Sequence, residues 1–482
     1  MDRSIDYVII VAYLVGVAIF GMFKGGKQKS SKDYFQGADS VHWWAVCFSI
    51  VAAETSTLTF ISIPGLAYLT NLNFLQVTMG YLIGRIFIAF FFLPSYFKGD
   101  LTTAYQFLDN RFGGKTRSFA SIVFLFTRLA ADGVRLFATA IPLKLMLDIS
   151  YPMAIIIIAV IALTYTYVGG VKGVIWVDVV QMFIYLGGAI LALGFLIFDF
   201  LPNGVDSIIA AATANNKLEI FNLGFSGGFA EFFSKPYTLL SGLLGGAFLS
   251  MASHGTDQLI VQRLLTTKSA KEGRKAIIGS GVLVIIQFAL FLFVGLGLYA
   301  FYGNGNLAEL GINKSDEIFP IFIIQQLPVG VSGIIIAGLF AAALSTLAGS
   351  ISALSSSTML DLYKPFTGID DEVKELKISR YFTIMWALLL IASAFFFMSS
   401  SQTVVELALS IASFTYGGLL GTFLLGLLNK KAKQEDALAG FTAGIFIMIT
   451  VISLHLVAWT WFTLVGVMAT LIVGSLLSKL KN

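Results

Sequence analysis

Charged residues are scarce in this chain: Asp, Glu, Lys and Arg make up 12% of its 482 residues, whereas soluble domains have about one quarter. Its single cysteine, Cys47, excludes an internal disulfide. The three histidines, His42, His254 and His455, have no neighbour at metal-ligand spacing. We find no Gly-rich phosphate loop, no Ser/His/Asp arrangement and no loop that could hold a soluble catalytic domain. These absences argue against an enzyme, and the net charge of +4 requires no nucleic acid.

Apolar residues are abundant instead, at 57% of the chain with a mean hydropathy of +0.86. Runs of roughly 20 apolar residues cross a hydrocarbon core of ~30 Å as a helix, and such runs recur along the whole chain. We therefore expect an all-α integral membrane protein with about 13 transmembrane helices. The expected segments are residues 5–23, 43–64, 73–97, 118–146, 151–168, 175–199, 237–260, 275–301, 329–358, 378–397, 403–428, 436–456 and 458–479.

Lysine and arginine are unevenly distributed among the expected loops. One side of the membrane receives 23 of them and the other side four, namely Arg3, Lys217, Lys235 and Lys314. The positive-inside rule then places the N-terminus outside and the C-terminus in the cytoplasm, in a multi-pass protein of the cell (plasma or inner) membrane. The basic side is made of the loops 24–42, 98–117, 169–174, 263–275, 361–380 and 429–435 and the C-terminus.

Small and hydroxylated residues crowd the middle of the expected segment 329–358. Ala342, Ser345 and Thr346 stand at i, i+3 and i+4 of one helix, so the Ala342 carbonyl and both hydroxyls can converge on one point. A hard monovalent cation is held by such a cluster of neutral oxygens. Hydrogen bonding between helices is the alternative, because hydroxyls in lipid must find partners within the protein.

Two expected segments contain residues that interrupt a membrane helix. In the second segment, Glu54 is followed by Thr55, Ser56, Thr57 and Thr59, whose side chains compete for backbone hydrogen bonds and favour helix ends. The seventh segment carries Ser241-Gly242 and Gly245-Gly246 at a similar depth. Interrupted helices in corresponding places of two halves indicate a transport site near the middle of the membrane.

Ionisable residues within the expected helices are costly and normally face a partner or a water-filled cavity. Arg128, Asp132 and Arg135 lie on one helix face and can neutralise one another. Arg135 could instead pair with Glu54 or bind a carboxylate on a substrate, because a guanidinium suits that geometry. The full set is Glu54, Arg85, Arg128, Asp132, Arg135, Lys144, Asp178 and Glu406, of which Lys144 and Glu406 lie near helix ends and are expected to snorkel.

The chain resembles the sodium:solute symporter family over nearly its whole length. The matching stretches are 49–65, 165–170 with 174–181, 257–263 and 337–363. The resemblance implies a five-plus-five inverted-repeat core of the leucine-transporter type. Its units would be an extra helix and cytoplasmic loop at 1–42, a first repeat at 43–200, an extracellular connection at 201–236, a second repeat at 237–428 and two extra helices at 429–482.

The resemblance also implies sites. Sodium would be bound by the carbonyls of Ala52, Thr55 and Ala342 and the hydroxyls of Ser345 and Thr346. Substrate would lie near Glu54, Ser56 and Thr59, facing Thr78 and Tyr81 of the third helix and the region of Gly245.

Two departures from the family pattern matter. Ala348 and Gly349 stand where members with a second sodium site have hydroxyls, so we expect one ion, with Asp178 on the sodium exit route. Ala131 stands where the sialate-binding arginine would be, one turn from Arg135, which argues against sialate.

The predicted function is sodium-coupled import of a small polar organic solute (sugar, amino acid or organic acid) by alternating access, with no obligate protein partner beyond the bilayer. An ionised Glu54 would favour an amine-bearing substrate or need Arg135 as a partner, whereas a protonated one would donate to a sugar-like hydroxyl. The alternatives are a proton-coupled transporter that uses Glu54 or Asp178, and, from another class, a channel or membrane sensor.

Overall fold

In the part of the chain that the computed structural model describes, the elements are all helices, joined by turns and loops. The described residues are 3–37, 41–99, 101–225, 228–303, 305–307, 309–312, 314–398 and 404–480. The α-helices are α1 (Ser4–Gly25), α2 (Ser31–Gln36), α3 (Trp43–Glu54), α4 (Thr57–Leu69), α5 (Leu75–Phe87), α6 (Leu93–Lys98), α7 (Gln106–Phe112), α8 (Gly114–Leu147), α9 (Tyr151–Phe195), α10 (Val205–Ala214), α11 (Phe229–Ser234), α12 (Gly246–Gly255), α13 (Gln258–Leu264), α14 (Ala270–Phe301), α15 (Ile318–Gln325), α16 (Val331–Ser357), α17 (Lys364–Thr367), α18 (Glu372–Phe397), α19 (Val404–Leu428), α20 (Gln434–Ser453) and α21 (Phe462–Leu480). They are joined or extended by the π-helical turns η2 (Ile88–Phe92), η3 (Leu196–Phe200), η4 (Ser241–Gly245) and η6 (Thr358–Tyr363) and by the 3-10 turns η5 (Ser315–Glu317) and η7 (Trp459–Trp461).

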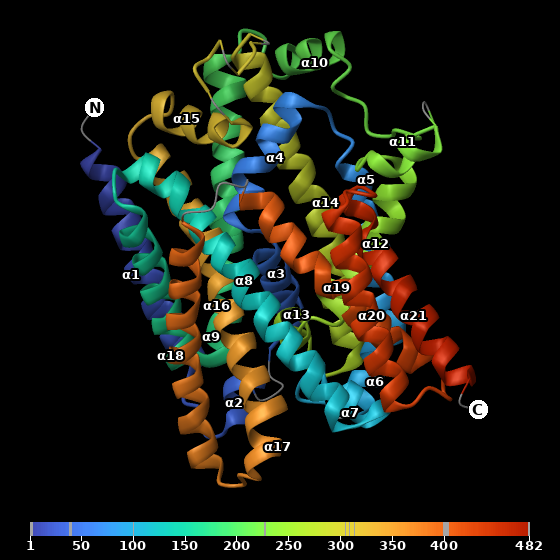
Figure 1. Ribbon diagram of the computed structural model, residues 1–482. Helices are drawn as coiled ribbons and strands as arrows, with labels where there is room; N and C mark the ends of the chain where they lie inside the picture. The colour runs from blue at the N-terminus through green and yellow to red at the C-terminus, as the bar shows by residue number, and fades with distance from the viewer. Residues whose placement is uncertain are drawn as a thin grey trace.

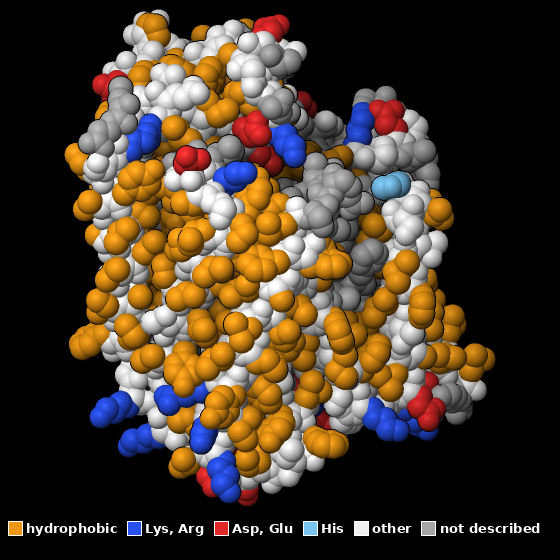
Figure 2. All heavy atoms as spheres, turned by 60° about the vertical axis from the view of Figure 1, so that its left-hand side comes forward, with side chains coloured by type: hydrophobic (Ala, Val, Ile, Leu, Met, Phe, Trp, Pro, Cys, Tyr) orange, Lys and Arg blue, Asp and Glu red, His pale blue; other side chains and the backbone are white. Residues whose placement is uncertain are grey.

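The long helices form a bundle with the two chain termini at opposite ends (Figure 1). The short helices α10, α11 and α15 lie at the end that carries the N-terminus, and α2, α7 and α17 lie at the other end. These two groups belong to loops that the lysine and arginine count assigns to opposite sides of the membrane. Figure 2 shows a broad band of hydrophobic side chains bordered at both ends by charged ones, as expected for a membrane-crossing surface.

The thirteen predicted segments all fall on helices, but fewer helices qualify as unbroken spans. In the described part of the chain, eight stretches are long and apolar enough to cross a membrane, or nine if the bent pair α3–α4 counts as one span. Helix α9 and η3 run as one stretch where the sequence predicts two segments, and α8, α12 with α13, and α19 are not among the nine. The number of spans by this criterion is thus below the predicted count, while the all-helical membrane class is confirmed.

The predicted loop 169–174 is a sharp reversal of α9. Gly170 adopts φ 56° and ψ −162°, a conformation that favours glycine. A Cβ placed on Gly21 of α1 would lie 2.7 Å from atoms of both Tyr165 and Val177. These two residues would be about 18 Å apart along a straight helix. The chain therefore folds back on itself at Gly170, and both arms of α9 pack against α1.

Helix α16 lies at the centre of the bundle, and nearly all its residues from Ser332 to Ser357 are buried. It packs against α1, α3, α8, α9, α13 and α18. Its many hydroxyls therefore face protein groups on all sides. Such a helix can carry ligands for a small ion without exposing them to lipid.

The predicted break in the second segment is confirmed. Helix α3 ends at Glu54, and α4 begins at Thr57 with its axis bent by 63° from that of α3. Between the two helices, Thr55 (ψ 96°) and Ser56 (ψ 167°) are extended. A helix that ends here leaves its last carbonyl oxygens without intrahelical donors.

The predicted break at 241–246 in the seventh segment is wrong. Those residues form the π turn η4, which runs directly into α12. The glycines serve close packing against α5, because a Cβ on Gly242 would lie 2.8 Å from the Cβ of Gln76 and one on Gly246 would collide with the Val77 carbonyl oxygen. The helix is interrupted later instead, at Thr256 and Asp257, between α12 and α13.

Candidate functional site

A cavity of about 570 Å³ lies beside the break between α3 and α4. Five of the six predicted substrate residues line it: Glu54, Ser56, Thr59, Tyr81 and Arg135. The other lining residues are Ala53, Ser62, Ile63, Leu66, Leu69, Phe74, Arg128, Tyr237, Leu249, Ser250, Ser253, His254, Leu259, Ile260, Phe288, Ser315, Asp316, Thr346, Tyr416 and Trp459.

The sixth predicted substrate residue, Thr78, lies elsewhere, and so does Gly245, whose region is also expected near the substrate. Thr78 is fully buried, and its hydroxyl donates to the carbonyl of Leu75 at 2.8 Å, within its own helix. A Cβ on Gly245 would collide with the backbone of Thr460, so this glycine serves packing. The sequence identified the right helices, but it could not say which face of each helix meets the cavity.

The predicted sodium ligands lie on α3 (Ala52), directly after it (Thr55) and on α16, and the two helices pack against each other. Thr346 donates from its hydroxyl to the Ala342 carbonyl at 3.1 Å, as the i, i+4 spacing requires. Thr55 donates its amide and its hydroxyl to the Val51 carbonyl. Thr57, at the start of α4, reaches across to the carbonyl of Leu339 on α16 at 3.4 Å. The helix break is thus held directly against α16.

Ser345, the other predicted hydroxyl ligand, donates to Asp178 Oδ1 at 2.6 Å. Asp178 is completely buried in α9 and also accepts from Ser49 at 2.5 Å. Its charge is balanced by Arg263, whose Nη2 lies 3.0 Å from Asp178 Oδ2. The sequence did not foresee this ion pair, because Arg263 was assigned to a cytoplasmic loop.

Glu54 forms an ion pair with Arg85, and His254 Nε2 lies 3.5 Å from the same carboxylate oxygen. Arg85 is completely buried and also donates to Ser280 at 2.8 Å. The suggestion that Glu54 pairs with Arg135 is therefore wrong. Arg85 is among the charges expected within the membrane, but only the packing of α3, α5, α12 and α14 brings its partners together.

The predicted charge cluster on α8 is confirmed. Arg135 Nη1 lies 2.9 Å from Asp132 Oδ1, and Arg128 Nε lies 3.4 Å from Asp132 Oδ2. Ser350 of α16 donates to the same carboxylate at 2.5 Å. The Arg135 side chain is 24% exposed, against 9% for Arg128. Arg135 therefore has an edge available to a molecule in the cavity while its other edge is held.

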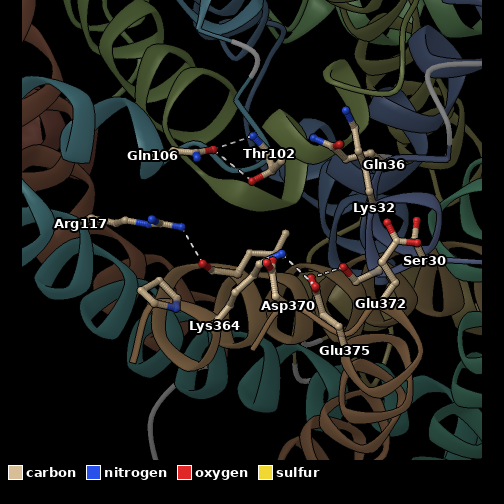
Figure 3. A pocket seen from close by; sticks show the side chains of 13 residues that line it. Ser30, Lys32, Gln36, Thr102, Gln106, Arg117, Lys364, Asp370, Glu372 and Glu375 are labelled. Atoms are coloured by element: carbon tan, nitrogen blue, oxygen red, sulfur yellow. Dashed lines mark hydrogen bonds and ion pairs between the residues drawn. The ribbon is translucent and has the colours of Figure 1, made fainter. Parts of the chain in front are cut away.

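A second cavity, of about 620 Å³, lies among the elements at the basic end of the bundle and shares no lining residue with the first. Figure 3 shows Arg117 pointing to the carbonyl of Leu360 and Lys364 pointing to Glu375 across this space. Arg117 also pairs with the buried Asp361 at 2.8 Å. These ion pairs join α8 to η6 and α17 to α18.

Solved structures similar to this chain define its class. A structure of the substrate-bound outward-open state of a Na⁺-coupled sialic acid symporter superimposes with a TM-score of 0.88 at 26% identity, covering 99% of this chain and 98% of that one. Mhp1, a nucleobase-cation-symport-1 family transporter, superimposes with a TM-score of 0.58 at 12% identity over 91% and 92% of the two chains, a likeness of fold alone. The protein is a multi-pass, all-helical membrane transporter with the inverted-repeat fold of the leucine-transporter type.

Sequence comparison then gives the family. The family described as "Sodium:solute symporter family" matches residues 34–444, so the chain belongs to that family. One relative, the sodium/sialic acid symporter NanT of Aliivibrio fischeri (strain ATCC 700601 / ES114), is 31% identical over 485 residues, which cover 99% of this chain and 94% of the relative. The protein is a sodium-coupled solute symporter, a transporter and not an enzyme. Sodium is one of its transported substrates. This function replaces the three alternatives, which were a proton-coupled transporter, a channel and a membrane sensor.

Proposed function

We propose that this symporter imports a small polar organic solute that carries a carboxylate, together with one sodium ion per cycle. The observation that carries the proposal is that Thr346 and Arg135 line the same cavity. Thr346 belongs to the proposed sodium site, and Arg135 presents a partly exposed guanidinium. An anionic group of the solute would then lie near both the bound sodium ion and the guanidinium of Arg135.

The proposed sodium ligands are the carbonyls of Ala52, Thr55 and Ala342 and the hydroxyls of Ser345 and Thr346. The end of α3 supplies carbonyls that no longer serve the helix, and α16 supplies a carbonyl and two hydroxyls one turn apart. Five neutral oxygens suit a weakly held alkali cation, which must be released in every cycle. Because the ligands come from two elements, a bound ion favours the arrangement in which these elements are joined.

The rest of the proposed solute site has hydrogen-bonding groups and little unbalanced charge. Glu54 is paired with Arg85, which leaves Ser56, Thr59 and Tyr81 to bind hydroxyl or amide groups of the solute. This pairing argues against an amine as the main feature recognised by Glu54. In the proposed site, Glu54 holds Arg85 in place and accepts hydrogen bonds from the solute.

We propose further that the basic end of the bundle is cytoplasmic in the cell (plasma or inner) membrane, with the N-terminus outside. The central cavity is bordered by Ser315 and Asp316, from a connection on the N-terminal side, so it would receive solute from outside. The repeats at 43–200 and 237–428 would then rock until the Arg117–Asp361 contact opens. Asp178, hydrogen-bonded to Ser345, stays on the proposed exit route of sodium.

The charge of the solute decides the accumulation that one sodium ion can drive. Moving one charge through 100 mV gives about 2.3 kcal/mol, and a tenfold sodium gradient gives about 1.4 kcal/mol. A zwitterion carried with one sodium uses both terms, ~3.7 kcal/mol, and can accumulate roughly 500-fold. A monoanion carried with one sodium is electroneutral and can accumulate only about tenfold.

Purified protein screened by thermal shift against carboxylates, sugars and amino acids, in sodium and in potassium, tests the proposal. We expect stabilisation that requires both sodium and a carboxylate-bearing solute. Uptake and counterflow in proteoliposomes then establish carrier activity on the solute found. Stabilisation by neutral sugars alone would contradict the proposed solute class, and stabilisation that is equal in potassium would contradict the sodium site.

A further inference from the structure

Asp178 is a buried carboxylate in the second arm of α9, and both of its oxygens accept hydrogen bonds. One oxygen accepts from Ser345 at 2.6 Å, and the other accepts from Ser49 at 2.5 Å and from Arg263 Nη2 at 3.0 Å. A buried carboxylate is costly unless a positive charge and hydrogen bonds compensate it. Here the guanidinium of Arg263 supplies the positive charge.

Arg263 is held in place from three directions. Its Nε donates to Ser49 Oγ at 2.8 Å, and its Nη1 donates to the Leu259 carbonyl at 2.7 Å. With Nη2 on Asp178, each of its nitrogens has a partner, and the side chain is only 3% exposed. The guanidinium is therefore a fixed part of the site.

Gly349 makes the room that Arg263 occupies. A Cβ at this position would lie 2.5 Å from Arg263 Nη2 and 3.0 Å from Nη1. Gly349 lies in the middle of α16, where its backbone conformation does not require glycine. It stands one turn after Ser345 on the same helix face. The absence of a side chain at Gly349 thus allows the guanidinium of Arg263 to reach Asp178, which accepts a hydrogen bond from the proposed ligand Ser345.

We infer that Arg263 is a built-in cation that neutralises Asp178, orients Ser345 for sodium and keeps a second alkali ion out of the site. The inference rests on the proposed sodium site. A hydroxyl has one proton and two lone pairs, so the proton of Ser345 that points to Asp178 leaves its lone pairs for sodium. Because Arg263 already neutralises the charge of Asp178, a second cation would gain little electrostatic stabilisation at that carboxylate. Arg263 is a positioning residue, since it acts through Asp178 and Ser345.

Removing the built-in cation changes the number of ions carried. In Arg263→Gln the carboxylate of Asp178 loses its positive partner, and sodium is the cation available to replace it. We expect the ratio of ²²Na⁺ to solute taken up by proteoliposomes to rise from one to two. The Hill coefficient for sodium rises from near one to above one. Arg274→Gln is the matched control, because Arg274 donates to the Ala89 carbonyl away from this site.

A second variant acts on the geometry and keeps the guanidinium. Gly349→Ala displaces Arg263 from Asp178, and we expect the half-saturating sodium concentration to change at least several-fold. Gly187→Ala is its control, because a Cβ at Gly187 meets no atom within 4 Å. We expect no change in that variant. Melting temperatures with sodium show whether each variant is folded.

Three results would overturn the inference: a ratio of two in the unaltered protein, a ratio of one in folded Arg263→Gln, or equal effects of the two glycine variants. If Arg263→Gln does not fold, the inference is still tested by the ratio of sodium to solute in the unaltered protein and by the comparison of Gly349→Ala with Gly187→Ala. Failure of the proposed sodium coupling or of its site looks different. In that case the unaltered protein transports without sodium, or Ser345→Ala leaves its sodium dependence intact.

Discussion

Ser345→Ala is the most direct test of the proposed sodium site. The substitution removes one of the five proposed oxygen ligands. It also removes the hydrogen bond of 2.6 Å to Asp178, while alanine preserves the helix. An interaction with a charged group contributes about 1.5–3 kcal/mol, and each 1.4 kcal/mol is about tenfold in affinity. We therefore expect the half-saturating sodium concentration to rise roughly 10- to 100-fold.

The assay is solute uptake by proteoliposomes over a range of external sodium, with ionic strength held constant by potassium. Ser352→Ala is the control, because Ser352 is a buried hydroxyl of the same helix that accepts from Gln262 at 3.1 Å. Its loss removes a hydrogen bond between helices but no proposed ligand. Equal shifts in the two variants would mean that the hydroxyls of α16 only hold helices together, and the ligand assignment would be wrong.

Three further predictions concern the solute and the charges. Arg135→Lys should raise the half-saturating solute concentration roughly 10- to 100-fold with little change in the sodium dependence; unchanged solute binding would make the α8 cluster purely structural. Glu54→Gln leaves Arg85 buried without its counter-ion and should destabilise the fold by about 3 kcal/mol, seen as a lower melting temperature that Glu54→Gln with Arg85→Met partly restores. A melting temperature equal to that of the unaltered protein would show that His254 and Ser280 suffice for Arg85. Finally, a zwitterionic solute should produce an inward current on solid-supported membranes and a monoanion none. Current with the monoanion would contradict a single sodium ion.

Patterns within one helix were readable from the sequence. The apolar runs gave the helical segments, and the hydroxyls and acid of the second segment gave the break after Glu54. The i, i+3 and i+4 spacings gave the contact of Thr346 with Ala342 and the cluster of Asp132 with its two arginines. Each of these depends on the geometry of a single helix, which 3.6 residues per turn fix without reference to the rest of the chain.

The partners across helices were decided by the tertiary structure alone. Glu54 meets Arg85 instead of Arg135, and Asp178 meets Arg263, because the packing of α3, α5, α9 and α13 brings these residues together. Likewise, the glycines of the seventh segment pack against neighbouring elements, and the helix is interrupted at Thr256 and Asp257 instead. In lipid, apolar surface provides little preference among helix neighbours, so small residues and buried charges select them. A sequence shows where such residues stand along each helix, but the partner of each depends on the rotation and depth of every other helix.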